Sequence, residues 1–140
     1  MTPGAHCIVE ARMACLPGAI AFVEAFCAEH GVGHNDTVRL SLVVDELFTN
    51  TVQHGHGGDC DAPVRIELRA LAAAVELRYE DRAPAFDALA AAAPASLGAP
   101  ADDRAPGGLG LHLVRTFATR ARYARKDGRN RLWIVLPRRP

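Results

Sequence analysis

The sequence has no excess of charge of either sign, because lysine plus arginine and aspartate plus glutamate number 16 each. A general basic field is therefore lacking, and we expect no nucleic-acid partner. No apolar run reaches membrane-spanning length, and residues 1–13 lack the basic-then-apolar layout of a signal peptide. These absences predict a soluble, cytoplasmic protein that binds no membrane.

Cysteine is also scarce, and the spacing of its residues excludes the common zinc sites. No two cysteines form a C-x-x-C pair, and no histidine cluster has zinc spacing. His54 and His56 lack a third ligand nearby and are interpreted as loop histidines. We expect reduced, mostly buried thiols. They are Cys7, Cys15, Cys27 and Cys60.

The apolar residues that are present follow strand and helix patterns sufficient for one domain. With 140 residues and no internal repeat, the chain has room for a single core. The expected strands are 6–15, 63–71, 74–80, 121–126 and 130–136. The expected helices are 19–30 after a turn at 16–18, 38–52 with Asn35 or Asp36 as its N-cap, and 111–120. Together these elements predict an α+β two-layer sandwich, with an antiparallel or mixed sheet of about five strands and helices on one face.

Residues 88–106 differ from the rest of the chain because alanine dominates them and proline interrupts them. A short helix near 88–93 is expected, followed by a long loop. Long loops in compact domains are either functional lids or disordered segments.

Three features carry chemistry. Glu46 and Asn50 share one face of an apolar helix, where a carboxylate can accept a proton and an amide oxygen can hold Mg²⁺, unless both simply face solvent. Asp81 ends a strand, as many turn residues do. The run Gly107 to Gly110 opens a helix and offers N–H groups to an anion, or forms an ordinary tight turn. It is neither a Walker loop nor a Rossmann fingerprint.

In this order and spacing, the three features resemble the nucleotide-binding domain shared by gyrase, Hsp90, histidine kinases and MutL (GHKL). The resemblance implies a Bergerat-type ATP-binding fold as a single domain over 1–140, with a lid loop at about 88–106. The stretches DELFTNTVQHG, DRAPAFD, APGGLGLHLVR and YARKDGRNRLWIVL are similar to the stand-alone anti-sigma-factor serine/threonine kinases of bacterial partner-switching systems. Such a kinase phosphorylates a small STAS-type antagonist, sequesters a sigma factor or comparable regulator, and commonly dimerises.

The resemblance also implies roles for individual residues in binding ATP and Mg²⁺. Glu46 would be the general base, Asn50 would coordinate Mg²⁺, and Asp81 would receive the adenine amino group. His54 would border the nucleotide, and Arg104 would either reach the terminal phosphate or face solvent as a lid residue. The other implied ATP-binding positions are Ala83, Phe86, Gly107, Gly108, Leu109, Gly110 and Leu111.

One position departs from the family pattern. Glycine usually stands two residues after the adenine-binding aspartate, and here the residue is Ala83, followed by Pro84. Alanine fits if its φ is negative, and proline biases the preceding residue towards extended backbone. The departure leaves a second hypothesis open: a non-enzymatic binding module of anti-sigma type, with weak or structural ATP binding.

Two other ATPase classes fit less well. The catalytic half of a histidine kinase would need a dimerising helix with a phospho-acceptor histidine, from this chain or a partner. A topoisomerase or chaperone ATPase would need a transducer domain after the ATPase domain.

Overall fold

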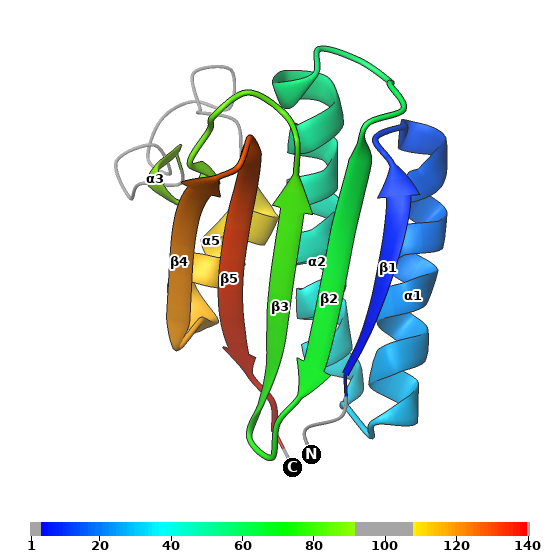
Figure 1. Cartoon of the computed structure of the whole chain (residues 1–140). Helices are drawn as coiled ribbons and strands as arrows, with labels where there is room; N and C mark the ends of the chain where they lie inside the picture. The colour runs from blue at the N-terminus through cyan, green and yellow to red at the C-terminus, as the bar shows by residue number, and fades with distance from the viewer. Residues whose placement is uncertain (1–3, 92–107, 140) are drawn as a thin grey trace.

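Alternating apolar residues form five strands of one sheet in the computed structural model, which describes residues 4–91 and 108–139. The strands are β1 (Gly4–Glu10), β2 (Pro63–Ala70), β3 (Ala74–Asp81), β4 (Arg120–Lys126) and β5 (Arg129–Pro137). Their order across the sheet is β1-β2-β3-β5-β4 (Figure 1). Every neighbouring pair is antiparallel, so the mixed alternative is wrong. Two of the four pairings, β2 with β3 and β4 with β5, are hairpins of consecutive strands, which are antiparallel by construction.

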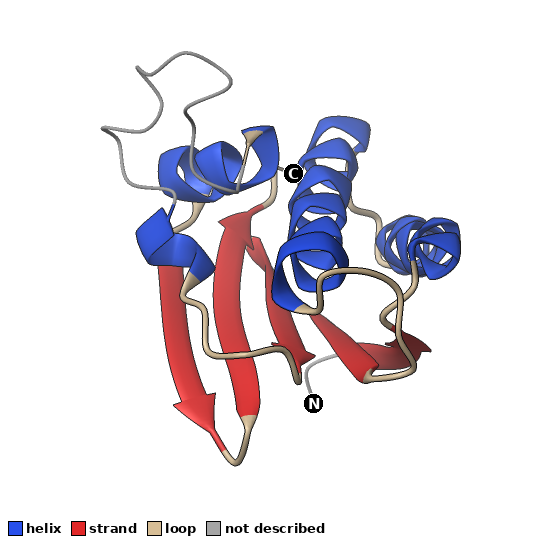
Figure 2. Ribbon diagram, turned by 90° about the horizontal axis from the view of Figure 1, so that it is seen from above, coloured by secondary structure: helices blue, strands red, loops and turns tan. Residues whose placement is uncertain are grey.

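The helices cover one face of this sheet, as the α+β two-layer prediction requires. Figure 2 shows them on one side, with none of the described helices on the other. They are α1 (Leu16–Glu29), α2 (His34–Thr49), the four-residue α3 (Ala88–Ala91) and α5 (Leu109–Phe117), with a 3₁₀ turn at Met13–Cys15 and a π-helical turn at Asn50–Gly55. None of the described helices is long and apolar enough to cross a bilayer.

The core lies between the helices and the inner face of the sheet. Apolar side chains at every second position of β2 point inward, and Ile66 and Leu68 are fully buried there. From the helix layer, α2 contributes Leu40 and Phe48, which are 1% and 0% exposed. Because α2 packs against both α1 and α5, it is the central helix of the layer and holds its side chains in fixed positions.

The first strand is shorter than predicted, and the first helix begins earlier. The chain leaves the sheet after Glu10 and forms the 3₁₀ turn, where the N–H of Met13 donates to Oδ1 of Asp59 at 2.9 Å. Helix α1 then begins at Leu16 and includes Pro17 in its first turn, where the missing N–H of proline costs no hydrogen bond.

The predicted N-cap of α2 is wrong as well. Gly33 is the N-cap, and no side chain caps the helix. Asp36 lies in the first turn instead, 9% exposed. Its carboxylate pairs with Arg39 at 3.3 Å and accepts the backbone N–H of Arg139 at 2.8 Å, so it joins α2 to the C-terminal segment.

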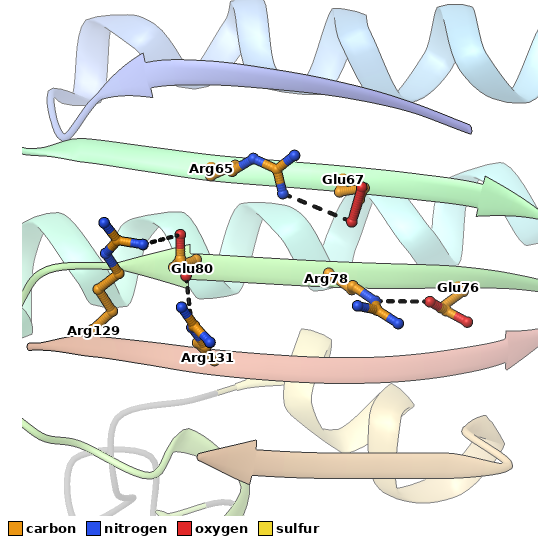
Figure 3. A network of polar contacts seen from close by, with 7 residues as sticks. All are labelled: Arg65, Glu67, Glu76, Arg78, Glu80, Arg129 and Arg131. Atoms are coloured by element: carbon orange, nitrogen blue, oxygen red, sulfur yellow. Dashed lines mark hydrogen bonds and ion pairs between the residues drawn. The ribbon is translucent and has the colours of Figure 1, made fainter. Parts of the chain in front are cut away.

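The outer face of the sheet carries ion pairs (Figure 3). Glu80 lies between Arg131 at 2.8 Å and Arg129 at 3.7 Å. Two further pairs join Arg65 to Glu67 and Arg78 to Glu76. Exposed pairs of this kind contribute about 0–1 kcal/mol each, so this face is kept polar but is only weakly stabilised by them.

Two sequence predictions concern the loop and the cysteines. The expected short helix near 88–93 is present as α3, where Oδ1 of Asp87 accepts the N–H groups of Leu89 and Ala90. The rest of the expected lid, including Arg104, lies outside the described residues, as does Gly107. All four cysteines are free thiols, but the prediction that most are buried is wrong, because Cys27 alone is buried and the others are partly exposed.

Candidate functional site

The helical segment that carries Glu46 continues beyond α2 as a π-helical turn, and Asn50 is its first residue. Such turns are rare and are frequently found at functional sites. Asn50 is 6% exposed, and its Nδ2 has no hydrogen-bond partner among the described residues. Leaving a buried amide group unsatisfied costs about 1–3 kcal/mol. The cost is recovered if a ligand contacts Asn50.

Glu46 connects this helix to the glycine-rich turn. The N–H of Gly108, the N-cap of α5, donates to Oε1 of Glu46 at 2.6 Å. The structure therefore brings the first and third predicted features together. A helix N-terminus attracts anions, and here the anionic group at that terminus is the Glu46 carboxylate.

Gly110 makes this contact geometrically possible. A Cβ atom at position 110 would lie 2.5 Å from the carbonyl oxygen of Leu42 and 2.6 Å from Cβ of Glu46. Only a residue without a side chain lets α5 approach α2 this closely. Gly110 therefore has a packing role, in addition to the phosphate-binding role predicted from the resemblance.

Asp81 lies at the end of β3, 7% exposed, and its carboxylate accepts three hydrogen bonds. Oδ1 accepts the N–H of Ala83 at 3.1 Å and Nδ2 of Asn130 at 2.8 Å. Oδ2 accepts Oγ1 of Thr51 at 2.7 Å. Thr51 belongs to the π-helical turn, so this bond joins the second predicted feature to the first.

Tyr79 hydrogen-bonds to the same Thr51 hydroxyl. Burial raises the pKa of Tyr79 well above its ordinary value, the hydrogen bond with Thr51 lowers it in part, and the charge of Asp81 raises it further. Tyr79 therefore keeps its proton, and its hydroxyl lies 2.6 Å from Oγ1 of Thr51. When Tyr79 donates to Thr51, the single Thr51 hydrogen is shared between Oδ2 of Asp81 at 2.7 Å and the carbonyl oxygen of Leu47 at 2.9 Å.

Asn130 is a site residue that was missed in the sequence. It lies on β5, 6% exposed, and its side chain contacts Asp81 and the loop that follows Asp81. A signal was present: in the alternation of β5, position 130 is in phase with the inward-facing Leu132 and Ile134. A polar residue at an inward position needs hydrogen-bond partners, and this one finds them at the site.

Ala83, the departure from the family pattern, is accommodated by a glycine elsewhere. Its φ is negative, since Asp127 is the one non-glycine residue with positive φ in the described part of the chain. Its side chain is 2% exposed and faces Gly55, where an added Cβ would lie 2.6 Å from the Cβ of Ala83. The backbone argument for alanine is therefore confirmed.

A small cavity of about 30 Å³ lies between these groups, with space for about two water molecules. It is lined by Leu47, Asn50, Thr51, Gly55, Tyr79, Asp81, Ala83, Phe86, Ala88, Asn130 and Leu132. A purine is larger than this cavity. Phe86, one of the lining residues, is 37% exposed. A larger hollow of about 720 Å³ lies over the outer face of the sheet, where residues such as Arg122 and Trp133 line it.

The remaining predicted residues are not among those that line the cavity. His54 is exposed and belongs to the π-helical turn, so the interpretation of His54 as a loop residue is wrong. Leu109 is 58% exposed beside Gly108, whereas Leu111 is fully buried in the core, so a ligand would reach Leu111 only through its backbone. Within the described ranges, no three histidine, cysteine or acidic side chains are grouped to hold a metal ion.

Comparisons with known proteins agree with this geometry. A family model described as the histidine kinase-like ATPase domain matches residues 9–136. The serine/threonine-protein kinase BtrW of Bordetella bronchiseptica is 35% identical over 96 residues, which cover 69% of this chain and 67% of that protein. The crystal structure of the RsbU and RsbW domains of Rv1364c from Mycobacterium tuberculosis matches 99% of this chain with a TM-score of 0.64 and 22% identity. This chain spans 34% of that longer one, and at such identity the likeness shows the fold alone.

Proposed function

Because the chain belongs to the histidine kinase-like ATPase domain family, we propose that it is an ATP-dependent protein serine/threonine kinase of a partner-switching system. Its substrate would be a small anti-sigma-factor antagonist of STAS type, phosphorylated on serine or threonine. It would also sequester a sigma factor or comparable regulator, in the cytoplasm and as a homodimer. The name of the related kinase from Bordetella bronchiseptica supports the kinase activity, and the resemblance of the four sequence stretches supports the partners.

One observation carries the proposal: three features far apart in the sequence meet around one site. Asn50 of the π-helical turn and Asp81 at the end of β3 line the same cavity. Glu46, one turn before Asn50, accepts the N–H of Gly108 at the start of α5. A carboxylate for proton transfer, an amide for a cation and a helix N-terminus for phosphate are the groups that phosphoryl transfer needs.

The described residues fit ATP and Mg²⁺. The Nδ2 of the buried Asn50 side chain is a hydrogen-bond donor without a partner among the described residues, which suits a phosphate oxygen, and the amide oxygen of the same side chain is a suitable ligand for Mg²⁺. Bound there, Mg²⁺ would neutralise charge on the phosphate oxygens. Asp81 would accept the adenine amino group, with Ala83 and Phe86 beside the base and His54 at the border of the nucleotide.

The phosphate groups would be bound at the N-terminus of α5. The N–H groups of Gly108, Leu109 and Gly110 would donate hydrogen bonds to the phosphate oxygens. Gly107 and Arg104, from outside the described residues, would also contribute. Phosphate would then replace Glu46 at the N–H of Gly108. The released carboxylate would accept the proton of the attacking serine or threonine hydroxyl.

The test is incubation of the protein with γ-labelled ATP, Mg²⁺ and a STAS-type antagonist protein from the same organism. We expect label on the antagonist with wild type, and loss of label with Glu46→Ala. Asp45→Ala is the matched control, because Asp45 is the exposed neighbour of Glu46 on α2 and its one side-chain hydrogen bond within the described ranges comes from Thr49. No transfer by wild type would overturn the kinase proposal.

A non-enzymatic binding module is the second candidate. Two observations favour it: the cavity is smaller than a purine, and Glu46 is already bound to Gly108. Calorimetry with ATP and Mg²⁺ separates the two candidates. Binding comparable with that of a kinase, abolished by Asp81→Ala, would argue against the second candidate.

A further inference from the structure

Asn130 of β5 ties the carboxylate of Asp81 to the loop that follows it. Its Nδ2 donates to Oδ1 of Asp81 at 2.8 Å and to the carbonyl oxygens of Ala83 at 3.2 Å and Pro84 at 3.0 Å. Its Oδ1 accepts the N–H of Phe86 at 3.1 Å and the hydroxyl of Tyr123 at 2.6 Å. The orientation of the amide is unambiguous, because exchanging its oxygen and nitrogen would place the amide oxygen against three other acceptor oxygens.

These contacts use the full hydrogen-bonding capacity of the Asn130 side chain. An amide offers two hydrogens and two lone pairs, and here it meets three acceptors and two donors. With 6% of the residue exposed, no group remains to bind a ligand directly. Asn130 is therefore a positioning residue that acts through Asp81 and its loop.

The same count leaves Asp81 with one acceptor position. A carboxylate has about four, and Asn130 and the N–H of Ala83 fill the two on Oδ1. The hydroxyl of Thr51, which also lies 2.9 Å from the carbonyl oxygen of Leu47, occupies one on Oδ2 at 2.7 Å. The remaining position on Oδ2 is matched to one N–H donor of a ligand in the cavity that Asp81 lines.

We propose that Asn130 sets the selectivity of the site for a base with an exocyclic amino group, by holding Asp81 and its loop so that this single acceptor is presented. The inference rests on the proposed function, because it assumes that the cavity receives a nucleotide base. Without Asn130, the carboxylate keeps its bonds from Ala83 and Thr51, but Oδ1 has an open position for water and the carbonyl oxygens of the loop lose their donor. A base with a carbonyl at the same place would set its oxygen against Oδ2 of Asp81, and two acceptors form no hydrogen bond.

The test compares two triphosphates that differ only in the amino group: ATP and purine ribonucleoside triphosphate. Calorimetry is run with wild type, Asn130→Ala and the control Asn35→Ala, which removes an exposed asparagine at the start of α2. We expect wild type and control to prefer ATP about tenfold, as one hydrogen bond allows. Asn130→Ala should lower the affinity for ATP about tenfold and leave the affinity for the analogue nearly unchanged. Equal weakening of both ligands, or unchanged preference, would overturn the role of Asn130.

A second variant covers the case in which Asn130→Ala does not fold. Tyr123→Phe removes one donor to Oδ1 of Asn130 and leaves the contact with Asp81 in place, so a smaller loss of ATP preference is expected; an unchanged preference contradicts the inference. The experiment separates a failure of the inference about Asn130 from a failure of the proposed function. If wild type binds neither triphosphate, the nucleotide site itself is wrong. If wild type prefers ATP and both variants keep that preference, only the role of Asn130 is wrong.

Discussion

Gly55 and Ala83 share space for a single methyl group, because a Cβ on Gly55 would lie 2.6 Å from the Cβ of Ala83. One residue belongs to the π-helical turn, and the other follows Asp81. The alanine that departs from the family pattern is therefore matched by a glycine on the facing element.

This relationship predicts a reciprocal effect of two substitutions. Gly55→Ala should lower the free energy of unfolding by about 1–3 kcal/mol through overpacking. The double variant Gly55→Ala with Ala83→Gly should recover most of the loss, apart from about 0.5–1 kcal/mol for the added glycine. Urea denaturation of the two single variants and the double variant measures the coupling. A Gly55→Ala protein as stable as wild type would contradict the shared space.

Gly110→Ala should separate α5 from α2, because its Cβ would meet the backbone of Leu42 at 2.5 Å and backbone cannot rotate away. We expect a loss of about 1–3 kcal/mol in stability and weaker ATP binding, since the contact between Glu46 and Gly108 is displaced. Gly18→Ala in α1 is the control, because a Cβ there meets nothing within 4 Å. The control should stabilise the protein by about 0.5–1 kcal/mol. Equal effects of both variants in denaturation would refute the packing role.

Glu46→Gln should separate the chemical role of Glu46 from its structural one. Glutamine retains an oxygen that can accept the N–H of Gly108, a bond of 2.6 Å in wild type, but it cannot take a proton at neutral pH. We expect stability close to wild type in denaturation and phosphoryl transfer reduced about 10²–10⁴-fold. Asp45→Asn, at the exposed neighbouring position, should leave transfer unchanged. Transfer at the wild-type rate in Glu46→Gln would exclude the base role.

Tyr79 should make the protein less stable at alkaline pH. Its folded-state pKa is raised well above the ordinary 10.0, mainly by burial, whereas in the unfolded chain the ordinary value applies. Below that value both states keep the proton and stability is unaffected. Above it the unfolded chain loses the proton first, so the free energy of unfolding falls as pH rises.

Denaturation at about pH 8 and about pH 11 measures this dependence. Tyr79→Phe should reduce the fall between the two pH values. At the lower pH it should cost about 1 kcal/mol, because the hydrogen bond with Thr51 is lost. If Tyr79→Phe loses as much stability as wild type between the two pH values, Tyr79 is not the source of the pH dependence.

The order and spacing of motifs predicted the family, the two-layer fold and the elements that carry the site. Glu46 and Asn50 were identified because they share one face of an otherwise apolar helix, and Asp81 because it places an acid at the end of a strand. The alanine-rich composition of residues 88–93 also predicted a short helix, and the structure adds that Asp87 caps two N–H groups of its first turn.

What the sequence did not predict depends on contacts between distant residues. The close approach at Gly110 requires knowing that α5 crosses α2 at Leu42, a distance of many residues along the chain. The bonds of Asn130 reach Asp81 across the strand pair β3 and β5. The N-cap was misplaced because Asp36 is engaged by Arg139 at the far end of the chain, and a local preference cannot report such a partner.

The strand order has a consequence for aggregation. An edge strand offers unpaired backbone groups to other chains, and charged side chains discourage that pairing. The edge strand β4 carries Arg120, Arg122, Arg125 and Lys126 among its seven residues, so two copies brought together along β4 would place like charges side by side. The opposite edge, β1, has Glu10 as its one acidic side chain and leaves Ile8 60% exposed. Strand-to-strand association between copies is therefore disfavoured at β4 and less restrained at β1.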